Sequence, residues 1–308
     1  MATGTSVKVA VVGAGSIGQR HQRLLQELGH EVVVISKSSK SAKYKSLSDA
    51  LTQENFEYVV LASQTSQHFA DLSVLIEKNF VGSVLVEKPI FDRSEKLKPN
   101  RFKLLAVGYN LRFHPAIIWL QETLPQLGAI SSANLYVGQY LPTWRPDSDY
   151  RNSSSAKTDS GGGVLRDLSH ELDLVQYIFG DWNKLAAIGG KFSDLEIETD
   201  DTFSILMQTD QCSAVSVQMN YSDRLRQRMI TVNGNNGTIQ IDLVSNSATF
   251  NNSQMSFDVQ PDSTYVFQHN AVIHNQDLSI CSLADALKVV ATIEAVEKSA
   301  KKSKWITK

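Results

Sequence analysis

The chain has 308 residues, of which 42% are hydrophobic and 20% charged, and its formal net charge is −2. This length favours two domains over one core, and the balanced charge gives no general attraction to nucleic acid or to an anionic membrane surface. No apolar run is long enough to span a bilayer, and residues 1–6 lack the features of a signal peptide. Cys212 and Cys281 stand far apart, so neither a disulfide framework nor a metal site is indicated. We therefore expect a cytoplasmic protein without a metal.

The first third of the chain alternates short apolar runs with amphipathic stretches. Apolar residues recur at helical spacing from Ile17, and Gly29 is placed to end that helix. Two more helices are expected near residues 48–53 and 66–78. Strands are expected at Val7–Val12, Glu31–Ser36, Tyr58–Ser63, Val84–Glu87 and Lys103–Gly108. This βαβ alternation predicts an α/β domain over residues 1–110, with a doubly wound parallel sheet of the Rossmann type.

The pattern changes after about residue 110. The expected elements are, in chain order, a helix at 114–124, a strand at 129–141, a polar segment at 142–160, a single helix from 161–163 to Phe179, several strands with turn sequences between 184 and 267, and a helix at about 283–300. We therefore predict a second domain over residues 111–308, of α+β class, with a mostly antiparallel open sheet.

A glycine-rich turn, Gly13-x-Gly15-x-x-Gly18, follows the first strand. The first glycine permits the tight turn, the second lets the backbone approach a pyrophosphate, and the third lets helix and strand pack closely. Phosphate would then bind the N–H groups at the start of the helix, where Ser16 and Ile17 lie. Because a strand precedes the motif and a helix follows it, we interpret it as a dinucleotide site. A glycine-rich turn without a ligand is the alternative.

The choice of cofactor should be visible at the end of the second strand, where a carboxylate would hold the ribose hydroxyls of NAD. That position holds Ser36, and Lys37 follows it. A hydroxyl with an adjacent ammonium group suits the 2′-phosphate of NADP. We therefore predict NADP in preference to NAD, while an ordinary solvated loop is the alternative for these residues.

Several motifs occur together along the chain: Val11–Gly18, Leu61–His68, Glu87-Lys88-Pro89, Gly108–Pro115, Gly161–Gly180 and Asn233–Ile241. In their order and spacing they resemble those of the Gfo/Idh/MocA oxidoreductases, named for glucose–fructose oxidoreductase and inositol dehydrogenase. The resemblance implies a nicotinamide-dependent dehydrogenase whose second domain contacts the substrate. It also implies an open sheet that is often used for dimerisation, so a homodimer or a larger homo-oligomer is expected.

The family's catalytic lysine falls on Lys88, which would lie near the nicotinamide and steady the alkoxide that develops as hydride leaves. A surface lysine that merely ends a strand is the alternative. The bond to Pro89 is a candidate for the cis isomer. The resemblance places further cofactor contacts at Ser63, Thr65, His68 and Glu87. His68 could equally cap or pack the helix that follows it.

The second catalytic element surrounds Asp167. The family usually has a glycine two residues after this aspartate and a histidine four after it, whereas this chain has Ser169, His170 and Glu171. Offsets of three and four share one face of a helix, so the resemblance still implies His170 as general acid/base, oriented by Asp167. Glu171 remains the alternative group that meets the substrate. The simpler alternative is a helix N-terminal acid and an interior histidine.

The polar segment before this helix suggests the class of substrate. It interleaves Arg145 and Arg151 with Trp144 and Tyr150. Arginine binds carboxylate or phosphate bidentately, and aromatic faces stack on sugars or bases. The segment resembles a family branch associated with bacterial surface-polysaccharide clusters, which implies an anionic sugar or a sugar nucleotide as substrate. A solvated loop is the alternative, and Arg112 either contacts substrate or ties the two domains together.

Between the Glu87-Lys88-Pro89 turn and the next strand only about a dozen residues remain, near the lower limit for a parallel crossover. We therefore expect the helix there to be shortened or missing. Three functions stay open at this point. They are an NADP-linked dehydrogenase or reductase, a retained-cofactor epimerase or glycoside hydrolase of the same family, and a non-enzymatic NADP-sensing module.

Overall fold

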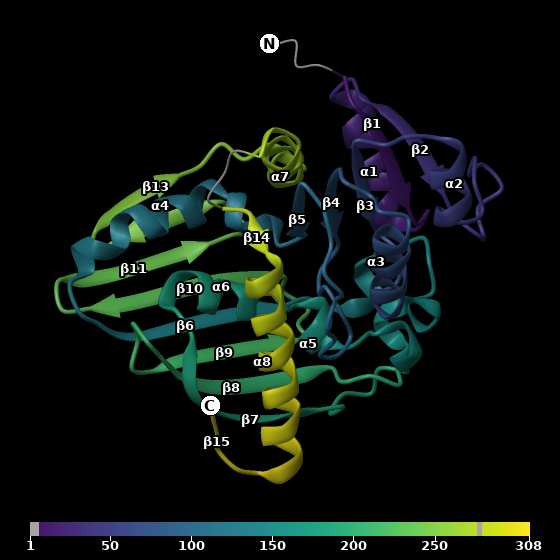
Figure 1. The fold of residues 1–308 in the computed structure, drawn as a ribbon. Coiled ribbons are helices and arrows are strands. Elements are labelled where there is room, and N and C mark those ends of the chain that lie inside the picture. Colours follow the sequence, from purple (N-terminus) through teal and green to yellow (C-terminus); the bar gives the residue numbers. More distant parts are fainter. Residues whose placement is uncertain (1–5, 276–278) are drawn as a thin grey trace. The chain divides into compact units, whose positions relative to one another are not determined.

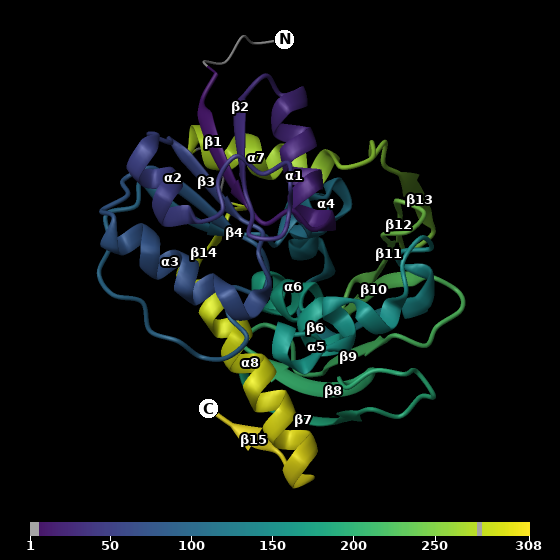
Figure 2. The same ribbon diagram turned by 90° about the vertical axis from the view of Figure 1, so that its right-hand side faces the viewer.

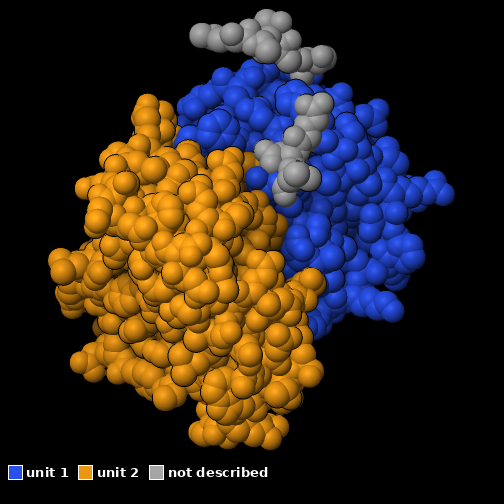
Figure 3. Space-filling model, turned by 90° about the vertical axis from the view of Figure 1, so that its left-hand side faces the viewer, with its two compact units in different colours: residues 1–110, 262–287 blue, residues 111–261, 288–308 orange. Residues whose placement is uncertain are grey.

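The computed structural model describes residues 6–275 and 279–308, which divide into two compact units (Figure 3). The first unit comprises residues 1–110 and 262–287, and the second comprises residues 111–261 and 288–308. The sequence assigned all of 111–308 to the second domain. The structure instead includes 262–287 in the first unit, because helix α7 (Ser263–His274) buries Val272 in the core of that unit and β14 (Cys281–Ser282) pairs with β5.

The sheet of the first unit has six strands in the order β14-β5-β4-β3-β1-β2. All neighbours pair in parallel except β14, which is antiparallel to β5. The strands that precede β14 in the chain are β1 (Lys8–Val12), β2 (Glu31–Ile35), β3 (Tyr58–Leu61), β4 (Ser83–Val86) and β5 (Leu104–Val107). The strand order reverses between β1 and β3 (Figure 1), and ligands of open α/β sheets bind in the crevice beyond such a point.

Helices cover this parallel sheet, and every residue of β3 and β4 is buried, as expected for strands with both faces covered. Besides α7, the helices of the unit are α1 (Ser16–Glu27), α2 (Leu47–Gln53) and α3 (His68–Glu77). Among the described residues no helix lies between β4 and β5, in agreement with the short spacing there. The predicted parallel sheet is therefore confirmed.

The second unit is built on a nine-stranded sheet (Figure 2) in the order β13-β12-β11-β10-β6-β9-β8-β7-β15. Neighbouring strands are antiparallel except β6 and β9. In β8, buried and more accessible residues alternate, as in a sheet with one covered face. The strands are β6 (Ile130–Gly138), β7 (Trp182–Gly190), β8 (Thr202–Thr209), β9 (Val215–Asn220), β10 (Gln227–Gly234), β11 (Gly237–Asp242), β12 (Ser247–Phe250), β13 (Ser253–Ser256) and β15 (Ile306–Thr307).

The predicted single helix from 161–163 to Phe179 is wrong in one respect, because the structure has two helices there. α5 (Val164–Asp167) ends at Leu168, whose φ of −101° and ψ of 24° leave the helical region and interrupt the backbone ladder. α6 (His170–Phe179) then begins two residues after Leu168. The remaining helices are α4 (Pro115–Thr123) and α8 (Leu283–Lys302). Short 3₁₀ turns occupy most of the polar segment between β6 and α5.

Candidate active site

The three glycines of the turn after β1 differ in what a side chain at each position would meet. At Gly13, with a φ of +108°, a side-chain Cβ would lie 2.3 Å from the Ala62 carbonyl oxygen, because the turn after β1 passes close to the end of β3. At Gly18 a Cβ would lie 2.1 Å from the Gly13 carbonyl oxygen. A Cβ at Gly15 would meet nothing within 4 Å. Chain packing therefore requires two of the glycines, and the third leaves open space.

The start of α1 fits a bound phosphate. No side chain caps the helix at Gly15, and no acidic residue lies in its first turn. The first N–H groups of a helix lack partners within the helix and carry its positive partial charge, so they favour an anion. A cavity of about 610 Å³ beside this turn is lined by residues that include Ala14, Ser16, Arg20, Ser39 and Ser41. The open cradle and the uncapped helix together fit the pyrophosphate of a dinucleotide.

Ser36 and Lys37 follow β2, on the same edge of the sheet as the glycine turn. The Ser36 hydroxyl accepts a hydrogen bond from the Ser39 backbone at 3.3 Å. Within the described part of the chain Lys37 forms no ion pair; burial raises the pKa of Asp71, and the charge of Lys37 partly offsets this rise. Ser63 donates to the Asp71 carboxylate at 2.6 Å, so its hydroxyl is directed to α3.

Lys88 follows the end of β4, which lies beside β3 in the sheet, and the bond to Pro89 is cis. Its neighbour Glu87 is only 7% exposed, and the Glu87 carboxylate lies 2.9 Å from His21 Nε2. The Lys88 backbone N–H also donates to this carboxylate, at 3.2 Å. Burial acts to raise the pKa of Glu87, but the hydrogen bond from His21 and the charge of Lys88 bring the pKa below its ordinary value.

The structure places His68 inside the protein. It is 1% exposed, with Nδ1 3.1 Å from the Ile90 carbonyl oxygen and Nε2 3.1 Å from that of Ser63. His68 therefore joins the turn after β3 to the turn after β4, and burial lowers its pKa. These contacts favour a packing role over direct cofactor contact. Thr65 begins the 3₁₀ turn just before α3 and is partly accessible.

In the second unit, Asp167 is the last residue of α5 and His170 the first of α6. The helix break between them means that the rule for residues three apart on one helix does not apply to this pair. His170 is 8% exposed. The Tyr221 hydroxyl donates to Asp167 Oδ2 at 2.6 Å, and burial, reinforced by the charge of Asp167, raises the pKa of Tyr221 well above its ordinary value. Sequence analysis missed Tyr221, because nothing local distinguishes a tyrosine at the end of β9.

Glu171 has a partner of its own. Both of its carboxylate oxygens accept hydrogen bonds from Arg228 of β10, at 2.7 and 2.9 Å, and Glu171 is 2% exposed. A bidentate pair of this kind engages both oxygens of the carboxylate. Of the two alternatives for the substrate-facing group, this arrangement favours His170. Arg228 was also missed by sequence analysis, because its pairing joins residues far apart in the chain.

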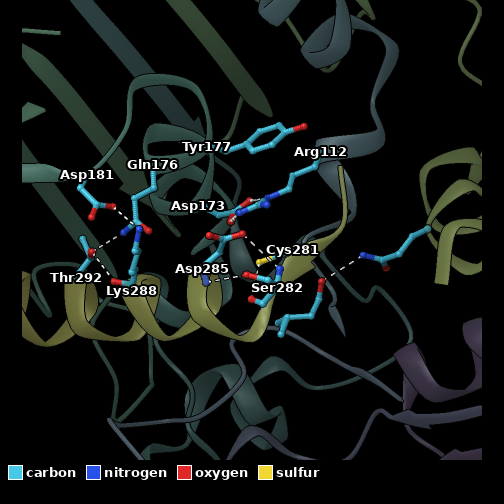
Figure 4. A network of polar contacts seen from close by, with 12 residues as sticks. Arg112, Asp173, Gln176, Tyr177, Asp181, Cys281, Ser282, Asp285, Lys288 and Thr292 are labelled. Carbon is cyan, nitrogen blue, oxygen red and sulfur yellow. Dashed lines mark hydrogen bonds and ion pairs between the residues drawn. The ribbon is translucent and has the colours of Figure 1, made fainter. Parts of the chain in front are cut away.

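Arg112 pairs with Asp173 of α6 (Figure 4). Its Nη2 lies 2.6 Å from Asp173 Oδ1 and its Nε 2.9 Å from Oδ2, while its guanidinium lies over the Tyr177 ring at 4.4 Å from the ring centre. Arg112 and Asp173 are both almost fully buried. These contacts indicate that Arg112 holds the start of the second unit against α6.

The segment predicted to contact substrate is partly neutralised by acids. Arg151 pairs with Asp149 and Glu196, and the Tyr150 hydroxyl accepts a hydrogen bond from the Glu196 backbone. Trp144 packs edge-on against Tyr221, with ring centres 5.3 Å apart. Arg145 is exposed, and no described residue forms an ion pair with it. Arg145 is therefore the arginine of this segment best placed to bind an anion.

Two kinds of feature are missing from residues 6–275 and 279–308. No group of three or more His, Cys, Asp or Glu side chains there is arranged to hold a metal ion. No helix in this part of the chain combines the length and apolar character needed to cross a bilayer.

Comparison with known proteins gives relatives at two levels. An inositol 2-dehydrogenase of Acidothermus cellulolyticus is 26% identical over 271 residues, which cover 78% of this chain and 74% of the relative. Among solved structures, a levoglucosan dehydrogenase in complex with NADH matches with a TM-score of 0.85 and 15% identity, over 98% of this chain and 99% of that one. The WlbA dehydrogenase of Bordetella pertussis, in complex with NADH and UDP-GlcNAcA, matches with a TM-score of 0.81 and 18% identity over 99% of both chains. At these identities the structural matches show the fold.

Two family models match successive parts of the chain. One, described as the oxidoreductase family with an NAD-binding Rossmann fold, matches residues 7–100. The other, the GFO/IDH/MocA C-terminal domain, matches residues 125–240. Together the two matches cover most of the chain and include the glycine turn, Lys88 and the pair Asp167 and His170. The chain therefore belongs to the Gfo/Idh/MocA family of oxidoreductases.

Proposed function

We propose that this oxidoreductase transfers hydride between NAD(P) and a secondary hydroxyl or ketone of a sugar-like substrate. The observation that carries the proposal is the position of Lys88. The chain leaves β4 at this lysine, on the same edge of the sheet as the open glycine turn before α1. In open α/β sheets this edge binds the ligand. When bound, the nicotinamide would supply the hydride acceptor or donor.

The residues of the glycine turn would bind the cofactor. The N–H groups of Ser16 and Ile17 at the start of α1 would contact the pyrophosphate, and Gly15 would leave room for it. Thr65 would line the nicotinamide side, in the turn after β3. Ser36 and Lys37 would contact the 2′-phosphate, which favours NADP over NAD.

Three side chains would act on the substrate. The Lys88 ammonium group would hydrogen-bond to the reacting oxygen and stabilise the negative charge that develops on it. In the oxidative direction His170 would take the hydroxyl proton as hydride leaves the adjacent carbon, and it would return this proton in reduction. Asp167, held by Tyr221, would orient the acid/base group.

The class of substrate follows from the relatives and from the polar segment. The matching proteins include dehydrogenases of inositol and levoglucosan, and the WlbA structure holds UDP-GlcNAcA. In this chain Arg145 is exposed beside the half-buried Trp144. A free guanidinium next to an aromatic face suits an acidic sugar or a sugar nucleotide. We therefore propose an anionic sugar derivative as substrate.

The test is a binding and turnover experiment. Titration with NADPH and NADH, followed by a panel of neutral, acidic and nucleotide-linked sugars, should show tighter binding of NADPH and turnover with an anionic member. Lys88→Met should retain cofactor binding and lose turnover. Tighter binding of NADH would contradict the NADP assignment.

Two other results would replace the dehydrogenase assignment. Substrate conversion without net change in nicotinamide absorbance, with cofactor retained through gel filtration, would indicate a retained-cofactor epimerase or hydrolase. Cofactor binding with no conversion of any sugar, and biological output unaffected by Lys88→Met, would indicate a sensing module.

A further inference from the structure

Four polar side chains form a continuous chain of contacts inside the first unit. The Tyr58 hydroxyl lies 2.9 Å from His269 Nδ1, His269 Nε2 lies 2.9 Å from His21 Nδ1, and His21 Nε2 lies 2.9 Å from Glu87 Oε1. They come from β3, α7, α1 and the end of β4, and none is more than 7% exposed. Burying this many polar groups is unfavourable unless each finds a partner.

The chemistry of the end members, Glu87 and Tyr58, sets the direction of the hydrogen bonds between the four side chains. An ionised carboxylate only accepts hydrogen bonds, so Glu87 requires the proton of His21 on Nε2. At the other end, the Tyr58 hydroxyl donates its proton to His269 Nδ1, so a neutral His269 carries its own proton on Nε2 and donates it to His21 Nδ1. Burial lowers the pKa of His269 well below its ordinary value, in keeping with a neutral ring.

Charged and titratable groups around these four side chains hold α7 against α1. Asp262, just before α7, pairs with Arg20 and Arg23 of α1. The Arg20 guanidinium lies over the Tyr265 ring, and Tyr265 packs edge-on against His21. Burial raises the pKa of Tyr265 to about 12, so it stays protonated at neutral pH. The position of His269 against His21 is therefore fixed by several independent contacts.

The carboxylate at the end of the chain is enclosed on its other sides. The Lys88 backbone N–H donates to Glu87 Oε2, and a Cβ at Gly108 would lie only 2.9 Å from Glu87 Oε1. The carboxylate thus connects His21 directly to the backbone of the turn that carries Lys88. Any rotation of Glu87 would move or release the Lys88 N–H.

We propose that His21 and His269 are positioning residues, which hold the Glu87 carboxylate and thereby fix the turn at Lys88, with Tyr58 as the terminal donor. The inference rests on the proposed function for the role of Lys88 in turnover. It assigns a task to α7, a helix that follows β13 in sequence and supplies His269. Of the four hydrogen-bonded residues only Glu87 is adjacent to Lys88 in sequence. The effect of the other three on Lys88 is therefore transmitted through hydrogen bonds.

The first test compares His21→Gln with His21→Leu. The glutamine side-chain amide can still donate to Glu87, whereas leucine leaves the buried carboxylate without this donor. We expect His21→Leu to lower kcat about 10- to 100-fold with little change in KM, and His21→Gln to recover much of the loss. His114→Leu removes a buried imidazole from the second unit and serves as the control for general loss of stability. An unchanged kcat in His21→Leu would overturn the proposal.

The second test needs no substrate. Nitrogen NMR of the imidazole rings should show protons on Nε2 of both His21 and His269, and the Lys88 backbone amide signal should shift in His21→Leu and in His269→Leu but not in His114→Leu. Protons on Nδ1 of both rings, or a Lys88 signal that does not move, would overturn the proposal. If these signals behave as expected while the wild-type protein converts no sugar, the positioning role stands and the proposed function fails.

Discussion

Gly15 and Gly18 belong to one motif but differ in what a side chain would meet. A Cβ at Gly15 meets nothing within 4 Å and the φ there is −74°, so Gly15→Ala should leave the thermal midpoint unchanged. The methyl group would occupy the space needed by the pyrophosphate, and we expect the Kd for NADPH to rise about tenfold, or about 1.4 kcal/mol. Gly18→Ala should instead lower the midpoint, because its Cβ would lie 2.1 Å from a backbone oxygen. Unaltered NADPH binding by Gly15→Ala, measured by fluorescence titration, would contradict the cofactor site.

The hydrogen bond from Tyr221 to Asp167 can be tested by a single substitution. Tyr221→Phe removes the donor at 2.6 Å from Asp167 and keeps the ring that packs against Trp144. We expect kcat to fall about tenfold, or about 1.4 kcal/mol of transition-state stabilisation, because Asp167 loses the hydrogen bond that holds its carboxylate in position. Tyr136→Phe is the matched control, since that hydroxyl donates to Asp223 at 2.8 Å in the same unit. Equal kinetic effects of the two substitutions would refute a specific role for Tyr221.

Among the helices, the start of α5 depends on a half-buried acid. Asp200 Oδ1 accepts from the Leu165 backbone at 3.1 Å, and burial raises the pKa of Asp200 to about 6 from an ordinary value of 3.8. The folded state therefore holds this proton more tightly than the unfolded chain. The stability that the protonated form contributes is complete below about pH 4 and is lost as the pH rises through 6, by about 3 kcal/mol in all.

Asp200→Asn keeps an acceptor for Leu165 and removes the charge. We expect the thermal midpoint of this variant to exceed that of the wild type at pH 8 and to match it near pH 4, as measured by calorimetry at both pH values. Asp210→Asn, a change of the same kind in the same unit, is measured at both pH values as the control for the substitution itself. If the midpoint of Asp200→Asn exceeded that of the wild type only at low pH, the pH dependence would have the opposite sign. That result would contradict the prediction.

The same element shows where local patterns stop being informative. The parallel strands were predictable because strands covered on both faces are continuously apolar, as β3 and β4 are. The break between α5 and α6 was not, because Leu168 and Ser169 include neither the glycine nor the proline that usually marks a helix end. The sequence pattern predicted one continuous helix that contains both Asp167 and His170, and the interruption lies between them.

Across the molecule, the sequence predicted local motifs better than it predicted which side chains contact one another. The glycine turn, the cis bond at Pro89 and the missing helix before β5 each depend on residues close together in the chain. The pairs Tyr221 with Asp167, Arg228 with Glu171 and His269 with His21 join residues 54, 57 and 248 positions apart. No local period encodes such pairs.

The inclusion of residues 262–287 in the first unit is a long-range feature of the same kind, and it can be tested directly. α7 buries Val272 in the first core and supplies His269, while β14 completes the edge of the sheet beside β5. We expect a fragment of residues 1–110 to unfold without cooperativity, because it leaves that core and the polar groups of His21 and Tyr58 uncovered.

The matched fragment joins residues 1–110 to 262–287 through a flexible Gly/Ser linker and should unfold in one cooperative transition, followed by circular dichroism and hydrogen exchange. The same joined fragment with Val272→Asp is the control, since Val272 is fully buried and an uncompensated charge there should abolish the gain. Cooperative unfolding of residues 1–110 alone, at the midpoint of the joined fragment, would show that the first unit needs no C-terminal segment. Loss of cooperativity only in the fragment without 262–287 would show that the two ends of the first unit fold as one core.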